Sequence, residues 1–168
     1  MLIYSGPASA NPFDNFAKSF PNLWKLSTAL AYLLGFIFVI RSIMGFRAHA
    51  ENRGGGGGLK LPIVLFLVGS VLIYTPTVVS TLMLSTFGYS SPFYQPTRIG
   101  FASKYANILL FIEFIGLISF IRGWVMIVGT AQQGSHHSMG KAITHIVGGL
   151  LGVNIGGTVD VLHKTFMP

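Results

Sequence analysis

Cysteine is absent from the chain, and charged residues are scarce. Without Cys, the protein has no disulfide, no thiolate metal site and no cysteine nucleophile. Only 9% of the 168 residues are Asp, Glu, Lys or Arg, whereas a soluble domain averages about a quarter. With 51% hydrophobic residues, a chain of this size has too little charge to cover a water-exposed surface. The composition therefore predicts an integral membrane protein.

Acidic residues are the scarcest of the charged types. Asp and Glu number 4 against 11 Lys and Arg, and the formal net charge is +7. In a soluble protein such an excess would indicate nucleic acid. Here the basic residues lie mostly at the ends of apolar runs, so membrane topology and lipid headgroups explain them, and no sequence-specific nucleic-acid binding is expected. The basic residues that we expect to meet headgroups around the first loop are Arg41, Arg47, Arg53 and Lys60.

Residues 1–22 are predicted to form a polar lead that precedes the membrane domain. The lead is punctuated by proline and its first basic residue is Lys18, which is unlike a secretory signal, so we expect the first apolar segment to be retained. Phe13, Phe16 and Phe20 recur at helical spacing. A short helix lying on the membrane surface is one interpretation of this spacing, and an irregular tail is the other.

Four apolar segments predict an all-α membrane domain over residues 23–168, with three to four hydrophobic helices in a hairpin arrangement. The expected spans are 23–46, 61–87, 105–130 and 142–163, and the expected loops are 47–60, 88–104 and 131–141. Pro76 predicts a kink or break around Tyr74–Thr75. The last segment is rich in glycine, so it either crosses the membrane or re-enters without crossing. The two halves resemble each other as helical hairpins, and no further internal repeat is evident.

Glycine recurs every four residues in the last apolar segment, which places these glycines on one side of a helix. The strip consists of Gly148, Gly152 and Gly156, widened by Gly149. In water such a strip only weakens a helix, but in lipid it lets another backbone approach closely. We therefore expect the segment to be a packing helix of a membrane assembly, with His145 and Asn154 as polar groups inside the strip.

Glu113 and Arg122 lie within the third apolar segment, where each costs about 2.5–3.5 kcal/mol at the bilayer centre. Nine residues at about 100° each place them on opposite faces of a helix, so they do not pair with each other. We expect each to meet water or a partner on a neighbouring helix or subunit, or Arg122 to snorkel to the headgroups, in a way that fixes the assembly. The alternative is a proton or ion relay, which would make the protein a small channel or transporter.

The histidines form no recognisable metal site. His136 and His137 are adjacent and point apart on regular structure, and the remaining three lie in other segments. A catalytic set is missing as well, because Ser135, His136 and Asp160 lack the context of a nucleophile elbow. We expect no enzyme, no metal and no cofactor, with bound phospholipid as the open alternative.

Residues 140–162, GKAITHIVGGLLGVNIGGTVDVL, resemble the C-terminal signature of the IcmC/DotE family of type IVB secretion systems. Relatives of that family include DotV, IcmD/DotP and the conjugation proteins TraQ and TraR of IncI-type plasmids. The Thr-His-Ile-Val-Gly-Gly core and the following Val-Asn-Ile carry most of the match. The resemblance implies His145, Gly148, Gly149 and Asn154 as motif positions, and it assigns none of them a catalytic role.

The resemblance implies a structural subunit of a bacterial type IVB secretion or conjugation machine, multi-pass in the inner membrane. Its partners would be copies of itself, other type IVB membrane subunits and membrane lipid. The first alternative is a pilin-like subunit assembled with phospholipid into an extracellular filament, because the chain has hairpins around a basic loop and a net positive charge. The second alternative is the channel or transporter suggested by the intramembrane charges.

Overall fold

The computed structural model describes residues 12–51, 58–88, 102–132 and 138–166. Within these ranges all regular secondary structure is α-helical, which confirms the predicted all-α class. The helices are α1 (Pro12–Glu51), α2 (Lys60–Ile73), α3 (Thr75–Phe87), α4 (Ala102–Ala131), α5 (Met139–Val153) and α6 (Ile155–Phe166).

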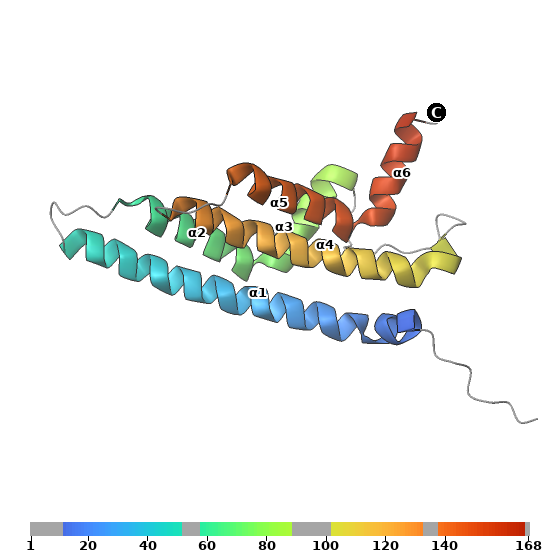
Figure 1. Ribbon diagram of the computed structural model, residues 1–168, viewed down its shortest axis with the longest axis horizontal. Coiled ribbons are helices and arrows are strands. Elements are labelled where there is room, and N and C mark those ends of the chain that lie inside the picture. The colour runs from blue at the N-terminus through green and yellow to red at the C-terminus, as the bar shows by residue number, and fades with distance from the viewer. Residues whose placement is uncertain (1–11, 52–57, 89–101, 133–137, 167–168) are drawn as a thin grey trace, which may run out of the picture.

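Two helical hairpins make up the described structure. The long helix α1 packs along α2, and the long helix α4 packs along α5 (Figure 1). In Figure 1, α4 lies between α1 and α5, and it also contacts α2. The first hairpin therefore provides a groove between α1 and α2, and α4 lies in that groove.

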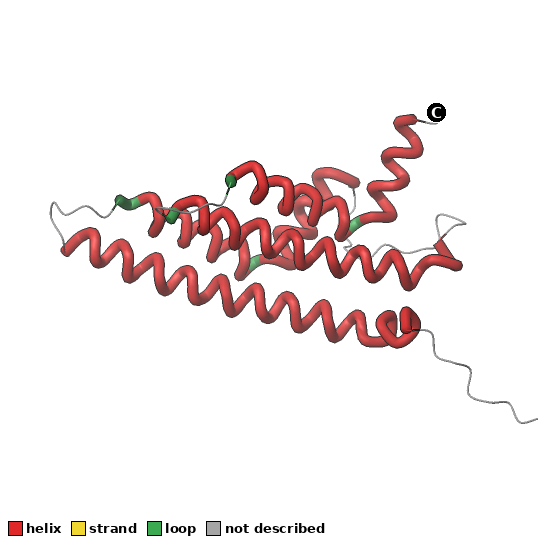
Figure 2. The backbone as a smooth tube through the Cα atoms, viewed as in Figure 1, coloured by secondary structure: helices red, strands yellow, loops and turns green. Residues whose placement is uncertain are grey.

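We call the second helix of each hairpin, α2 or α5, its return helix. Each return helix breaks and continues as α3 or α6, and the tube in Figure 2 bends at these points. The α2–α3 pair bends by 81° at Tyr74, which confirms the break predicted from Pro76. Pro76 has no N–H to continue the helical ladder, and it lies in the first turn of α3, where that N–H is not needed. The Thr75 hydroxyl donates to the Leu72 carbonyl at 2.8 Å and so satisfies one carbonyl at the end of α2.

The α5–α6 pair bends by 93° at Asn154, so residues 142–163 do not form one continuous helix. The bent pair has the form of a broken span or of the re-entrant segment given as the alternative. The Asn154 side-chain oxygen accepts the Gly157 N–H at 3.1 Å, which is the geometry of a helix N-cap. Asn154 is fully buried. A buried amide that caps a new helix, followed by two glycines, offers the backbone a turn instead of a straight helix.

The boundary predicted between residues 22 and 23 falls inside α1. Pro21 lies within the helix and does not end it. The buried Phe20 ring lies 6.1 Å from the Trp24 ring and 6.5 Å from the Phe114 ring of α4, centroid to centroid, so this part of the lead is packed on the hairpins. At its other end α1 continues to Glu51, beyond the predicted start of the loop at residue 47.

Length and composition qualify parts of the described structure to cross a membrane. Two single helices are long and apolar enough to cross, over Lys18–Glu51 and Ile108–Ala131. The number of candidate spans rises to four if each bent pair counts as one span. Large apolar side chains on α1 are exposed, which suits a lipid-facing helix. These features are those of an all-α membrane protein.

Two apolar clusters hold the hairpins together. One joins α1, α2 and α4 around the buried residues Ala31, Phe38, Leu65, Val68, Leu72 and Val128. The other joins α3, α4 and α5 around Val79, Met83, Leu117, Phe120 and Val153. Since α4 contributes to both clusters, it is the central element of the packing.

Candidate functional site

The first hairpin closes through a glycine pair. A Cβ placed on Gly35 would lie 2.6 Å from the Gly69 carbonyl oxygen, and one on Gly69 would lie 2.8 Å from the Gly35 oxygen. Near the loop end, the buried Ser42 hydroxyl donates to the Pro62 carbonyl at 2.7 Å. Backbones this close exclude any side chain at the two glycines, and such contacts are how helices associate in lipid.

The second hairpin closes in the same way. A Cβ on Gly149 would lie 2.8 Å from the Gly116 oxygen and would also collide with the backbone of Phe120. Toward the loop, a Cβ on Gly123 would lie 2.9 Å from the Ala142 oxygen. These contacts show that α4 and α5 run antiparallel with their backbones touching.

The glycines of the predicted strip do not share one contact face in the structure. Gly149 and Gly152 face α4, but a Cβ on Gly148 would meet no atom within 4 Å. Gly156 is buried and belongs to α6, beyond the break. The prediction that Gly148, Gly152 and Gly156 form one packing strip on one helix is therefore wrong, because the contact face is centred on Gly149 and the helix ends at Val153.

His145 joins the two helices of the second hairpin by a polar contact. Its Nδ1 lies 3.1 Å from the Ser119 hydroxyl oxygen, which also donates to the His145 carbonyl at 3.2 Å. Ser119 was not among the predicted residues, because a lone serine in an apolar run gives no distinctive signal. The pair adds a hydrogen-bonded link beside the glycine contacts.

Glu113 and Arg122 occupy different environments on α4. Glu113 is 1% exposed, whereas Arg122 is exposed. A Cβ on Gly116 would contact the backbone of Gly152 and Val153, so Glu113 lies one turn of α4 further toward the break at Asn154. The buried carboxyl is therefore on the part of α4 that faces the end of α5, among packed helices.

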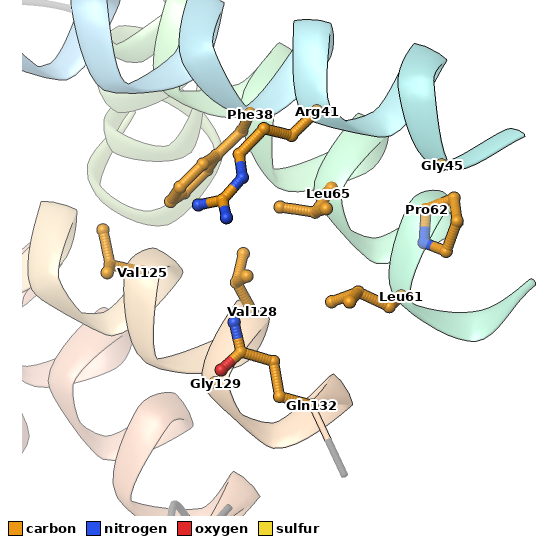
Figure 3. A pocket seen from close by; sticks show the side chains of 10 residues that line it. All are labelled: Phe38, Arg41, Gly45, Leu61, Pro62, Leu65, Val125, Val128, Gly129 and Gln132. Carbon is orange, nitrogen blue, oxygen red and sulfur yellow. The ribbon is translucent and has the colours of Figure 1, made fainter. Parts of the chain in front are cut away.

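A cavity of about 430 Å³ lies between α1, α2 and α4. Figure 3 shows the Arg41 guanidinium extending into it from α1, with Gln132 reaching in from the end of α4. The remaining lining is Phe38, Gly45, Leu61, Pro62, Leu65, Val125, Val128 and Gly129. One cation above an apolar lining suits the headgroup and upper chain of an anionic lipid.

The other predicted basic residues lie apart from this cavity. Arg47 is exposed and forms an ion pair with Glu51 at 2.7 Å, which contributes little in water. Lys60 is exposed at the start of α2. Arg53, like His136 and His137, lies outside the described residues. Within the described ranges no group of three His, Cys, Asp or Glu is placed to hold a metal ion.

Comparisons of the chain with protein-family models, with curated proteins and with solved structures found no match. The resemblance of residues 140–162 to the type IVB family thus stays a prediction. The geometry itself identifies the packing interfaces of α1 with α2 and of α4 with α5 as the principal candidate site.

Proposed function

We propose that the chain is a structural subunit of a bacterial type IVB secretion or conjugation apparatus, embedded in the inner membrane as part of an oligomer. The observation that carries a structural role is the backbone contact at Gly35–Gly69 and at Gly116–Gly149. Helices locked this closely form a rigid block, which is what an assembly subunit contributes to a machine. The signature at residues 140–162 supports the choice of the type IVB machine.

The surroundings of Glu113 favour this role over transport. Its carboxyl is buried on α4, and α4 contributes to both apolar clusters, one with α1 and α2 and the other with α3 and α5. A relay needs a chain of titratable groups or water across the membrane. Within the described residues, the cavity beside Arg41 is lined almost wholly by apolar side chains.

Purification from the native membrane tests the proposal. The tagged chain is expected to co-purify with other transfer proteins, and its deletion is expected to abolish transfer of protein or DNA between cells. Restoration by Gly58→Ala, whose methyl group meets no atom within 4 Å, but not by Gly149→Leu would tie transfer to the α4–α5 contact. A chain that is recovered alone, from cells whose transfer survives the deletion, would contradict the proposal.

A pilin-like filament subunit is the second candidate. The net charge of +7 suits neutralisation of phospholipid phosphates, and the exposed apolar residues of α1 suit packing in a lipid-containing filament. Shearing of intact cells separates the two roles. Filaments rich in this chain in the sheared fraction support the pilin, and retention of all of the chain in the membrane fraction excludes it.

A further inference from the structure

The long helices α1 and α4 carry the same short motif. Gly35–Arg41 and Gly116–Arg122 both read Gly-x-Ile-x-x-Ile-Arg, at positions 81 residues apart. In each helix the motif glycine contacts a glycine of the return helix, which is Gly69 on α2 in the first hairpin and Gly149 on α5 in the second. The motif therefore has the same structural place in both hairpins.

The broken return helices match as well. Gly69 and Gly149 are 80 residues apart, and so are Tyr74 and Asn154, where the helices break. The bends are 81° and 93°. We therefore treat α1–α3 and α4–α6 as two structural repeats. Counterparts are residues 81 apart in the long helices and 80 apart in the return helices.

The grooves of the two repeats differ in occupancy. In the first, Val68 of α2 is 2% exposed and belongs to one buried cluster with Val128 of α4, so α4 fills the groove. In the second, the counterpart of Val68 is Gly148, which is exposed and where an added Cβ would meet no atom within 4 Å. Arg122, the counterpart of Arg41 on α4, is exposed as well. The groove between α4 and α5 is thus open on this side.

The face of α4 with Leu117 and Ile121 packs on the first repeat, through the cluster with Val79 of α3 and the cluster of α1 and α2, and it has an uncovered counterpart on α1. Leu117 is 0% exposed and Ile121 is half-buried against the apolar clusters. Their counterparts on α1, Phe36 and Ile40, are 51% and 41% exposed. The second repeat therefore has an uncovered groove between α4 and α5 at Gly148. The first repeat has an uncovered apolar face on α1, which corresponds to the face of α4 that packs on the first repeat.

We propose that the α1 face with Phe36 and Ile40 packs into the α4–α5 groove, beside Gly148, of a second copy of the chain. This contact repeats between copies the one that α4 makes within a copy. Two different surfaces meet, so the contact is heterologous and continues into a ring or a filament. Gly148 lets the incoming helix approach closely, which favours association in lipid. The inference rests on the proposed function in taking the chain as an assembly subunit.

Because the chain has no cysteine, disulfide cross-linking reports this contact directly. The test pair is Ile40→Cys with Gly148→Cys. Their counterparts within the chain are Ile121 of α4 and Val68 of α2, and Ile121 packs on the cluster that contains Val68. Full-length chain with both cysteines, oxidised in native membranes, is expected to give a ladder of dimers, trimers and larger species. The two single variants co-expressed are expected to give dimers only, and each alone to give none.

The control pair is Leu34→Cys with Gly148→Cys. Leu34 lies about 120° around α1 from Ile40, and both it and its counterpart Ile115 are exposed, so no ladder is expected. An equal ladder from the control would mean random collision and would overturn the proposal. Dimers from Ile40→Cys alone would replace the head-to-tail contact by a two-fold one.

A second pair protects the test against a variant that does not fold. Leu117 and Val79 are buried in one cluster, and their counterparts Phe36 and Val159 are both exposed. Phe36→Cys with Val159→Cys is therefore expected to give the same ladder. Absence of a ladder from both pairs means that lipid or another protein covers the α1 face. If the chain still co-purifies with other transfer proteins, only the self-contact is wrong; a ladder without those proteins contradicts the proposed function alone.

Discussion

The first hairpin, α1 with α2, and the second, α4 with α5, have the same helix arrangement. They differ in whether another helix of the chain packs into the groove between their two helices. Both close through a glycine pair, and both return helices break five residues after that glycine. In the first groove, Leu65, Val68 and Leu72 of α2 are buried in one cluster with Val128 of α4. At the corresponding positions of the second hairpin, His145 and Gly152 contact α4, and Gly148 is exposed. A single scaffold thus has one groove used inside the chain and one available outside it.

The largest expected loss of stability comes from Gly149→Ala in the second hairpin, and the same change at the adjacent Gly148 serves as its control. Gly149→Ala places a methyl group against the Gly116 oxygen and the Phe120 backbone, so we expect the free energy of unfolding to fall by about 3 kcal/mol. Gly148→Ala is the control, because its methyl group meets nothing within the chain and the expected change is under about 0.5 kcal/mol. Steric-trap or denaturant unfolding of the dispersed chain measures both. Equal effects would contradict the placement of α5.

The same comparison in the first hairpin uses Gly69. A methyl group there would meet the Gly35 oxygen at 2.8 Å and the Val39 side chain at 2.9 Å. Gly69→Ala is expected to cost about 1–3 kcal/mol. Gly58→Ala, in open space before α2, is expected to leave unfolding unchanged. A stable Gly69→Ala variant would show that only the second hairpin depends on a backbone contact.

The break at Asn154 gives a smaller effect. Asn154→Ala removes the cap on the Gly157 N–H and is expected to cost about 1 kcal/mol, with fraying of the start of α6. Asn154→Ser keeps a capping oxygen and is expected to recover most of the loss. Amide hydrogen exchange of residues 155–158 measures the fraying, and equal exchange in all three proteins would argue that the cap does not fix the bend.

The smallest effects come from single hydrogen bonds between helices. Ser42→Ala removes the bond to Pro62 in the first hairpin, and Ser119→Ala removes the contact with His145 in the second. Each is expected to cost about 0.6 kcal/mol, the average for such bonds in membranes. Unfolding of both variants under identical conditions checks this, and a loss several times larger in one hairpin would show that the two are held by different forces.

The sequence predicts the class and much of the helical layout. Few charges and long apolar runs indicate membrane helices, and Pro76 locates the first break because a missing N–H has a local and specific consequence. Pro21 shows the limit of the same rule. It lies inside α1 beside Phe20, whose ring packs on Phe114 of α4. Tertiary packing thus maintains a helix that the local sequence would interrupt.

The face of α5 could not be predicted from glycine spacing alone. Gly148 and Gly149 are neighbours, and only the position of α4 decides which of them is buried. The break at Asn154 was missed because an Asn within an apolar helix and an Asn that caps the next helix have the same sequence context. The hairpin resemblance of the two halves is evident from the sequence, but the residue-by-residue correspondence was missed because the identities are few and the offset changes from 81 in the long helices to 80 in the return helices.

Accessibility of position 148 to a lipid-soluble reagent tests the central difference between the hairpins most directly. A spin label on Gly148→Cys would be compared in native membranes and in dilute detergent, with Leu34→Cys as reference. We predict that collision with dissolved oxygen is high at 148 in detergent and falls strongly in the membrane, while position 34 stays exposed in both. Equal, high accessibility of 148 in both states would mean that its groove faces lipid and that the second hairpin has no partner.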